Sequence, residues 1–172
     1  DTDTIEPGPL RLHSNIFTAI HDNNGNALEV WTNEATWNLR NKEIRVNLQN
    51  IHDDQRYPNA YAISNDKFII VWESRFGNST RGSNYANHDY DIYGKIFSRD
   101  GTPLKEEFKI NDEPVWEVTG FYNDVPNQVY SRAFKPVVSG SPSGGFIIAW
   151  ESEDQDSAGF GIYTKEFNIN IF

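Results

Sequence analysis

The sequence predicts an all-β fold of about three four-stranded, propeller-like blades, the last of them incomplete, and three observations carry this prediction. An apolar stretch, FIIVWES at residues 68–74, returns as FIIAWES at residues 146–152, and an Ile-Tyr pair follows each copy. Both stretches are rich in β-branched and aromatic residues, which is typical of short strands. No long segment keeps apolar positions at helical spacing between capping residues.

The two apolar stretches also predict how the strands are covered. A strand with one wet face alternates between apolar and polar residues, whereas a strand covered on both faces is apolar throughout. Sheets stacked around an axis, as in β-propellers, cover both faces of their inner strands, while a two-sheet sandwich covers one. We therefore expect stacked blades, with a β-sandwich as the alternative.

The second repeat, residues 57–112, is the best defined of the three. Residues 60–64 and 68–72 predict a hairpin across a short polar turn, and residues 91–97 predict a third strand after a long polar loop. A Gly-containing turn and a short strand at residues 107–111 close the unit. This repeat therefore has four expected strands.

The other two repeats are expected at residues 132–172 and 16–50 of one domain that spans residues 1–172. The third has strand patterns around FIIAWES, the second copy of the apolar stretch. Its fourth strand is expected to be missing or rudimentary. The first is expected to form a hairpin of residues 16–20 and 27–31 that ends at Trp31. Residues 1–15 are a candidate closing or exchanged strand.

These motifs resemble the Trp-ended, propeller-like β-repeats of large secreted bacterial and protist surface proteins. The matching pieces cover roughly the last two thirds of the chain and are residues 68–74, 91–97, Gly101, 107–111, 146–152 and 161–167. The resemblance implies four-stranded blades in surface or adhesive proteins, and it implies no particular ligand.

Composition restricts the partners and the location. The formal net charge is −10, so nucleic acid and anionic membrane surfaces are not expected partners. No apolar run approaches the roughly 18–20 residues of a membrane-spanning helix, so membrane insertion is not expected. The chain contains no cysteine and begins at Asp1 without a methionine, which suggests a processed secreted protein or a segment cut from a longer precursor. The expected location is extracellular.

Ring closure predicts self-association. Propellers need about four to eight blades, so about three blades leave two apolar faces and an unpaired strand edge uncovered. We expect a homo-oligomer or filament in which another copy covers them, with a compact monomeric sandwich as the alternative. The candidate residues for self-association are Leu10, Leu12 and Glu29. Glu29 stands where the other two copies of the apolar stretch have Ile70 and Ile148.

Aromatic residues in or near loops are candidates for binding a glycan. Trp37 and Trp116 fall outside the register of the repeated tryptophans, and Tyr122 and Tyr130 lie with Trp116 in an expected loop at residues 112–131. Aromatic rings in loops can stack on sugars or anchor a protein partner. The alternative is that they fill the junctions between blades.

Acidic residues near two corresponding loops are candidates for calcium binding. Asp89 and Asp91 precede one Ile-Tyr pair, and Asp154 and Asp156 lie in the loop before the other. Carboxylate oxygens suit calcium, but the EF-hand spacing is absent, and a solvated acidic turn is the alternative. No cofactor is required by the sequence, and calcium is the candidate.

The sequence contains no recognisable catalytic motif, so no enzyme activity is expected. The four histidines lack zinc-ligand spacing, and no phosphate-binding Gly loop or nucleophile elbow occurs. The predicted function is a non-catalytic extracellular structural or adhesive repeat protein that self-associates. A carbohydrate-binding lectin, assisted by calcium, is the first alternative, and a propeller glycosidase with paired carboxylates is the second.

Overall fold

The computed structural model describes residues 14–28, 43–47, 54–76, 89–112, 117–122, 125–129, 132–153 and 159–168. These residues form strands β1 to β11 and no helix, which confirms the all-β prediction for this part of the chain. No helix in the described ranges is therefore long and apolar enough to cross a membrane.

The central sheet has four antiparallel strands in the order β3-β4-β5-β6. Their bounds are Gln55–Ala62, Lys67–Phe76, Asp89–Ser98 and Phe108–Lys109. Each strand pairs with its neighbour in the chain, so the prediction of four consecutive strands is confirmed, and β3 begins at Gln55, two residues before the predicted start of the repeat.

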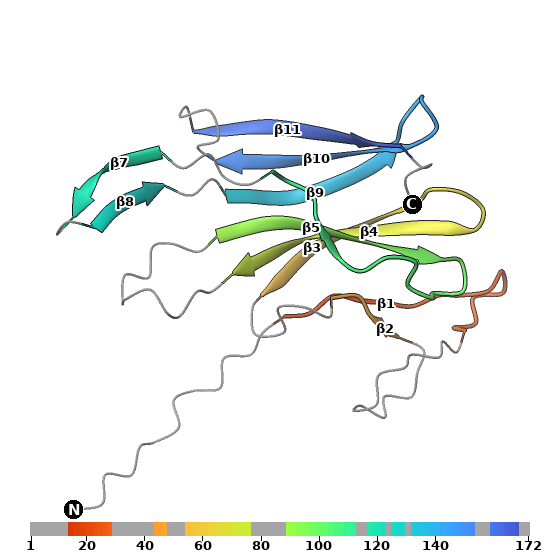
Figure 1. Cartoon of the computed structure of the whole chain (residues 1–172). Helices are drawn as coiled ribbons and strands as arrows, with labels where there is room; N and C mark the ends of the chain where they lie inside the picture. Colours follow the sequence, from red (N-terminus) through yellow and green to blue (C-terminus); the bar gives the residue numbers. More distant parts are fainter. Residues whose placement is uncertain are drawn as a thin grey trace, which may run out of the picture.

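Three further antiparallel units complete the described structure (Figure 1). The C-terminal sheet consists of β9 (Arg132–Gly140), β10 (Phe146–Glu153) and β11 (Phe160–Phe167) in the order β11-β10-β9. The N-terminal pair consists of β1 (Phe17–Thr18) and β2 (Ile44–Arg45), and a separate hairpin consists of β7 (Glu117–Tyr122) and β8 (Val125–Val129).

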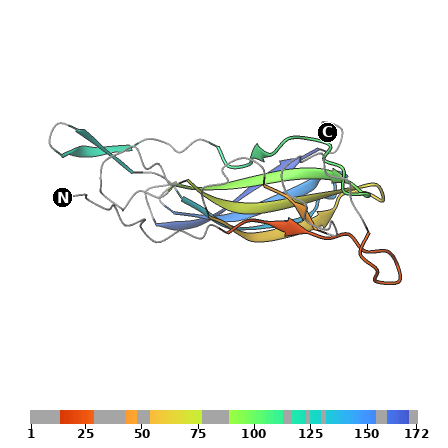
Figure 2. The same cartoon turned by 90° about the horizontal axis from the view of Figure 1, so that it is seen from below.

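The hairpin β7-β8 corrects the prediction that residues 112–131 form a loop. Gly120 and Pro126 obscured its strands in the sequence, because both residue types are unfavourable inside strands. Figures 1 and 2 both place this hairpin to one side of the stacked sheets, beyond the ends of their strands.

The N-terminal pair, the central sheet and the C-terminal sheet are stacked in chain order (Figure 1). One core cluster lies between the central and C-terminal sheets and contains Ile69, Val71, Ile92, Ile96, Ile110, Ala133, Val138, Phe146, Ile148 and Trp150. The second lies between the N-terminal pair and the central sheet and contains Ile16, Ile44, Val46, Ile70, Trp72 and Phe97. Residues 69–72 of β4 are therefore buried on both faces, as their apolar run predicted.

The first strands of the central and C-terminal sheets share a local distortion. Tyr57 and Lys135 have φ values of 51° and 49°, and a proline follows each of them. The strand pairing shifts register at both places, which indicates a β-bulge. The central and C-terminal sheets therefore share this β-bulge at the same place in their first strands.

The N-terminal pair corresponds to the third and fourth strands of the central sheet. The backbone N–H of Ile16 donates to the side-chain oxygen of Asn47 at 2.8 Å, and that of Ile92 donates to the side-chain oxygen of Asn111 at the same distance. The turns that follow β1 and β5 also match, because Gly25 and Gly101 both have positive φ.

This correspondence differs from the hairpin predicted for residues 16–20 and 27–31. In the described part of that segment, an isolated antiparallel bridge joins His21 and Ala27. Strand β1 pairs with β2 and not with residues 27–28. The asparagine contacts and the glycine turn fix this arrangement, and the apolar pattern did not reveal it. Glu29 and Trp31 lie outside the described residues.

Candidate functional site

An Ile-aromatic pair occurs at the same place in each of the three stacked units: Ile16-Phe17, Ile92-Tyr93 and Ile162-Tyr163. In the first two units the isoleucine points toward the following unit, and its exposed fraction is 4% and 0%. Ile162 is 72% exposed. Among the described residues, no other unit covers this face of the C-terminal sheet, whereas the other two units bury the corresponding face.

We call this uncovered surface the C-terminal face and define it by Val137, Ile147, Ala149, Phe160 and Ile162. Ile147 and Ala149 alternate along β10 with the buried Phe146, Ile148 and Trp150, so they lie on the opposite side of the strand. Cross-strand partners share a side, which places Val137 beside Ala149, and Ile162 beside Glu151. Val137 and Phe160 are 54% and 67% exposed.

The other end of the stack presents a different kind of residue. Tyr93 and Tyr163 point toward the preceding unit and pack against its core cluster. Phe17 occupies the same place in the N-terminal pair and is 45% exposed. We call this surface the N-terminal face and define it by Phe17 and its cross-strand partner Arg45.

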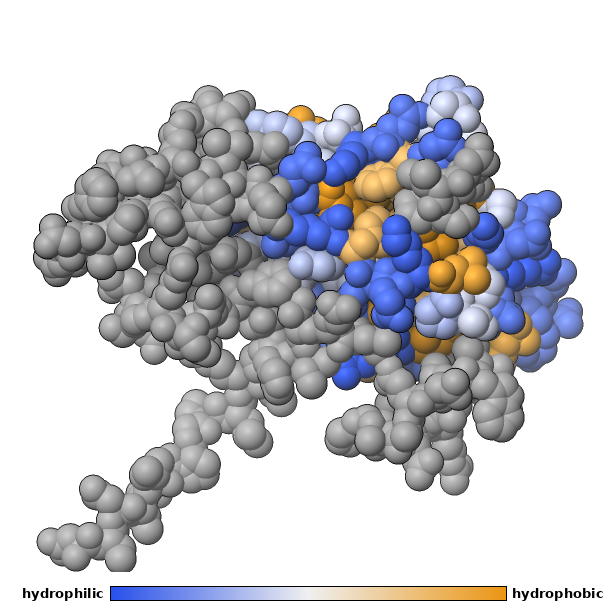
Figure 3. Space-filling view, viewed as in Figure 1, coloured by the Kyte–Doolittle hydropathy of each residue, from blue (hydrophilic) through white to orange (hydrophobic). Residues whose placement is uncertain are grey.

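Apolar surface is also visible from the side of the stack. In Figure 3, hydrophobic residues are visible among hydrophilic ones on the described part of the surface.

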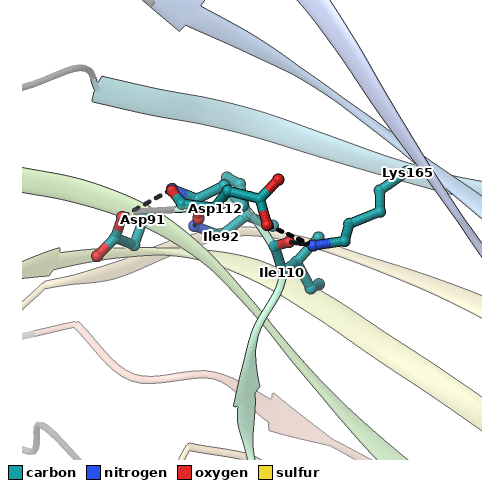
Figure 4. A network of polar contacts seen from close by, with 6 residues as sticks. Asp91, Ile92, Ile110, Asp112 and Lys165 are labelled. Carbon is teal, nitrogen blue, oxygen red and sulfur yellow. Dashed lines mark hydrogen bonds and ion pairs between the residues drawn. The ribbon is translucent and has the colours of Figure 1, made fainter. Parts of the chain in front are cut away.

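A lysine connects each sheet to the unit before it. The ammonium group of Lys95 donates to the backbone oxygen of Val46 at 3.3 Å, and that of Lys165 donates to the backbone oxygen of Ile110 at 3.1 Å. Lys165 also pairs with Asp112 at 2.7 Å (Figure 4). Since Val46 and Ile110 follow β2 and β6, the same contact fixes the register at both interfaces.

An asparagine organises the strand ends beside each lysine. The Asn111 amide accepts from the N–H of Ile92 and donates to Asp91 at 2.8 Å, and Lys109 pairs with Asp91 at 3.0 Å. Figure 4 shows Asp91 at one side of these contacts and Lys165 at the other, with Asp112 between them. The equivalent network in the N-terminal pair uses Asn47, Asn15 and Arg45, so the charge of Asp91 is replaced by a neutral amide.

The network accounts for one of the four metal candidates. The buried Asp91 carboxylate is held by an amide and an ammonium group. Asp89 lies on β5 opposite Phe76, and Asp154 and Asp156 lie outside the described residues. Within the described ranges no group of three or more His, Cys, Asp or Glu side chains is placed to hold a metal ion. Calcium binding stays a prediction.

A buried carboxylate lies at the interface between the central and C-terminal sheets. Glu73 is 3% exposed and accepts the backbone N–H of Lys135 at 3.3 Å. Burial raises the pKa of Glu73, and the Lys135 N–H together with the charges of Arg56 and Lys135 partly opposes this rise. Its counterpart Glu151 pairs with the Lys135 ammonium at 3.1 Å beside the C-terminal face.

Acidic turns line a hollow between the turn that follows β1 and the turns that follow β3 and β5. This hollow of about 510 Å³ is bordered by Ile20, His21, Asp22, Asn23, Leu28, Asp66, Ser98, Arg99 and Asp100. Hydrogen bonds from Asn26 lower the pKa of Asp22, and hydrogen bonds from Ser98 and Thr102 lower that of Asp100. These two carboxylates therefore stabilise their own turns.

The structure does not bring the predicted sugar-binding residues together in its described part. Tyr122 is the last residue of β7 and pairs with Val125, while Trp37, Trp116 and Tyr130 lie outside the described residues. Leu10 and Leu12, the other candidates for self-association besides Glu29, also lie outside them. Sugar binding and the role of these three residues stay predictions.

Sequence reasoning missed Phe17, Ile162 and the two connecting lysines. The sequence shows the Ile-Tyr pair after each apolar stretch, but whether such a pair is buried depends on a neighbouring sheet. Aligning the third strands of the repeats would have placed Lys95 and Lys165 at one position, which is the signal that the sequence offers.

Comparison with protein-family models, curated proteins and solved structures gives no match for this chain. Its function is therefore inferred from the geometry of the uncovered faces.

Proposed function

We propose that this chain is a non-catalytic extracellular β-repeat protein that self-associates through its sheet faces and serves as a structural or adhesive component. The observation that supports this proposal is the contrast between Ile162, which is 72% exposed, and its counterpart Ile92, which is fully buried. Burial of apolar surface is the dominant favourable contribution to most protein association. A surface with this residue pattern is therefore suited to packing against another sheet.

Two further features support sheet-to-sheet association. In the described residues β11 is an edge strand of the C-terminal sheet, and the backbone groups of an edge can pair with another strand. Val137, Phe160 and Ile162 are large apolar residues gathered on one face, which distinguishes them from scattered exposed side chains.

The stacked units are, in this proposal, propeller-like blades. The consecutive order β3-β4-β5-β6 and the repeated direction of stacking are the features of blades. The extracellular location rests on the resemblance of the repeats to those of secreted surface proteins.

Sedimentation velocity of the 172-residue chain tests self-association directly. We expect species larger than the monomer, and we expect Ile162→Glu to shift the distribution to monomer because it places a charge in the buried face. Leu104→Glu is the matched control, since Leu104 is also exposed but lies after the Gly101 turn, away from both faces. A wild-type protein that is strictly monomeric over an extended concentration range would contradict the proposal.

The lectin and glycosidase alternatives predict ligand binding instead. Saturable and competable sugar binding on a glycan array, lost on adding a chelator, would favour the calcium-assisted lectin. Under our proposal the chelator leaves the assembly unchanged.

A further inference from the structure

We infer that self-association is head-to-tail, with the C-terminal face of one copy bound to the N-terminal face of a second copy. This inference rests on the proposed self-association and adds which two surfaces meet. It follows from the direction in which the units stack inside one chain.

Both internal interfaces join the same two kinds of face. At the first interface, Ile16 of the N-terminal pair lies in one cluster with Trp72, and Tyr93 packs against that cluster from the central sheet. At the second, Ile92 lies in one cluster with Trp150, and Tyr163 packs against it from the C-terminal sheet. An isoleucine face therefore always meets an aromatic face.

The two ends of the stack carry one face of each kind. Ile162 continues the series of Ile16 and Ile92, whereas Phe17 continues the series of Tyr93 and Tyr163. The internal interfaces are thus a template in which the C-terminal face matches the N-terminal face. A second copy supplies the missing partner for each.

The polar residues at the two faces agree with this pairing. Arg45 lies across from Phe17 and gives the N-terminal face a positive charge. Glu166, the cross-strand partner of Ile147, accepts hydrogen bonds from Ser141 and Ser143 and gives the C-terminal face a negative charge. Opposite charges on two surfaces favour their encounter in the correct orientation.

The competing arrangement pairs two C-terminal faces around a two-fold axis. Such an interface uses one surface of each copy and stops at a dimer, whereas a head-to-tail interface leaves a free face at each end and continues to grow. The two arrangements therefore differ in their need for Phe17.

Two blocked variants and their mixture distinguish these arrangements. Ile162→Glu blocks the C-terminal face and Phe17→Glu blocks the N-terminal face, so each variant alone should sediment as a monomer. An equimolar mixture should form a one-to-one heterodimer and nothing larger, because each variant keeps the face that the other lacks. Leu104→Glu should assemble like the wild type, and near-ultraviolet circular dichroism should show that all variants keep the native fold.

The outcomes separate this inference from the proposed function. If the wild type associates while Phe17→Glu associates equally well, the head-to-tail arrangement is wrong and self-association stands. Absence of the heterodimer in a mixture of two folded, monomeric variants would also overturn the arrangement. If the wild type is a monomer, both the proposed function and this inference fail.

Discussion

The two repeated tryptophans differ in what accepts their indole N–H. The Trp72 indole donates to the side-chain oxygen of Gln55 at 2.9 Å inside the core. The buried Trp150 indole N–H has no acceptor in the described part of the chain, because Ala133 occupies the place that corresponds to Gln55. The same side chain is therefore held more firmly in the central sheet than in the C-terminal sheet.

Replacing Gln55 should remove this difference. We expect Gln55→Ala to lower the free energy of unfolding by about 1–3 kcal/mol, because the Trp72 N–H is left buried without its acceptor. Urea unfolding measures the change. In a Trp72→Phe background, Gln55→Ala should lower the free energy of unfolding by less. Trp150→Phe is the control, because it removes an indole that donates no such hydrogen bond. Equal costs in both backgrounds would show that the hydrogen bond contributes nothing.

Glu73 should make stability depend on pH. Because burial raises its pKa, the folded protein holds this proton more tightly than the unfolded chain does. The stabilisation is thus complete below the ordinary glutamate pKa and is lost as pH rises through the raised pKa. Arg56 and Lys135 are the facing positive charges, and Glu151 is the facing negative charge.

Glu73→Gln should remove this dependence while keeping an acceptor for the Lys135 N–H. We expect the stability of the variant relative to wild type to increase as pH rises from about 4 toward neutrality and then to level off. Urea unfolding across this pH range measures it, with Glu151→Gln as the control at the more exposed counterpart. A constant difference between Glu73→Gln and wild type would contradict the assignment.

At the scale of elements, the asparagines that follow β2 and β6 are equivalent but have different neighbours. Asn111 donates to the charged Asp91, whereas Asn47 donates to the neutral Asn15. We expect Asn111→Asp to destabilise the fold by about 1–3 kcal/mol at neutral pH, because two carboxylates would then face each other. Asn47→Asp should lower the free energy of unfolding by less, because its neighbour Asn15 is neutral and Arg45 donates a hydrogen bond to Asn15.

Unfolding of both variants at neutral and acidic pH checks this prediction. The cost of Asn111→Asp should shrink in acid, where one of the two facing carboxyl groups becomes protonated. Equal costs for the two variants at every pH would mean that the charge of Asp91 does not matter.

The long strands and the short β6 could be predicted from the sequence, and the pairing of β1 with β2 could not. Strands β4 and β10 carry apolar runs that are long enough to identify, and glycine turns mark their neighbours. Strands β1 and β2 have two residues each, and contacts with Asn47 define their pairing more than any pattern does.

The candidate site was the least predictable part for a related reason. Aromatic and acidic residues were selected by type, and several of them lie outside the described residues. Phe17 and Ile162 belong to apolar strand patterns that look the same as their buried counterparts. Their exposure depends on which unit covers them, and residues adjacent in the sequence do not determine this.

At the scale of the whole molecule, self-association should make thermal stability depend on concentration. A partner that binds only the folded state raises the melting temperature by mass action. We expect the melting temperature of the wild type to rise over about a hundredfold range of concentration, measured by scanning calorimetry. That of Ile162→Glu should stay constant, and Leu104→Glu should behave as the wild type does. A wild-type value that never changes would argue against assembly.

The enclosed position of Lys95 has a practical consequence. Lys95 is 1% exposed, and its ammonium group lies under the N-terminal pair, against the backbone oxygen of Val46. An amine-reactive reagent can therefore modify it only after that pair has moved away from the central sheet. The extent of modification at Lys95, followed over time by mass spectrometry, would report how often the first layer detaches while the other layers stay folded.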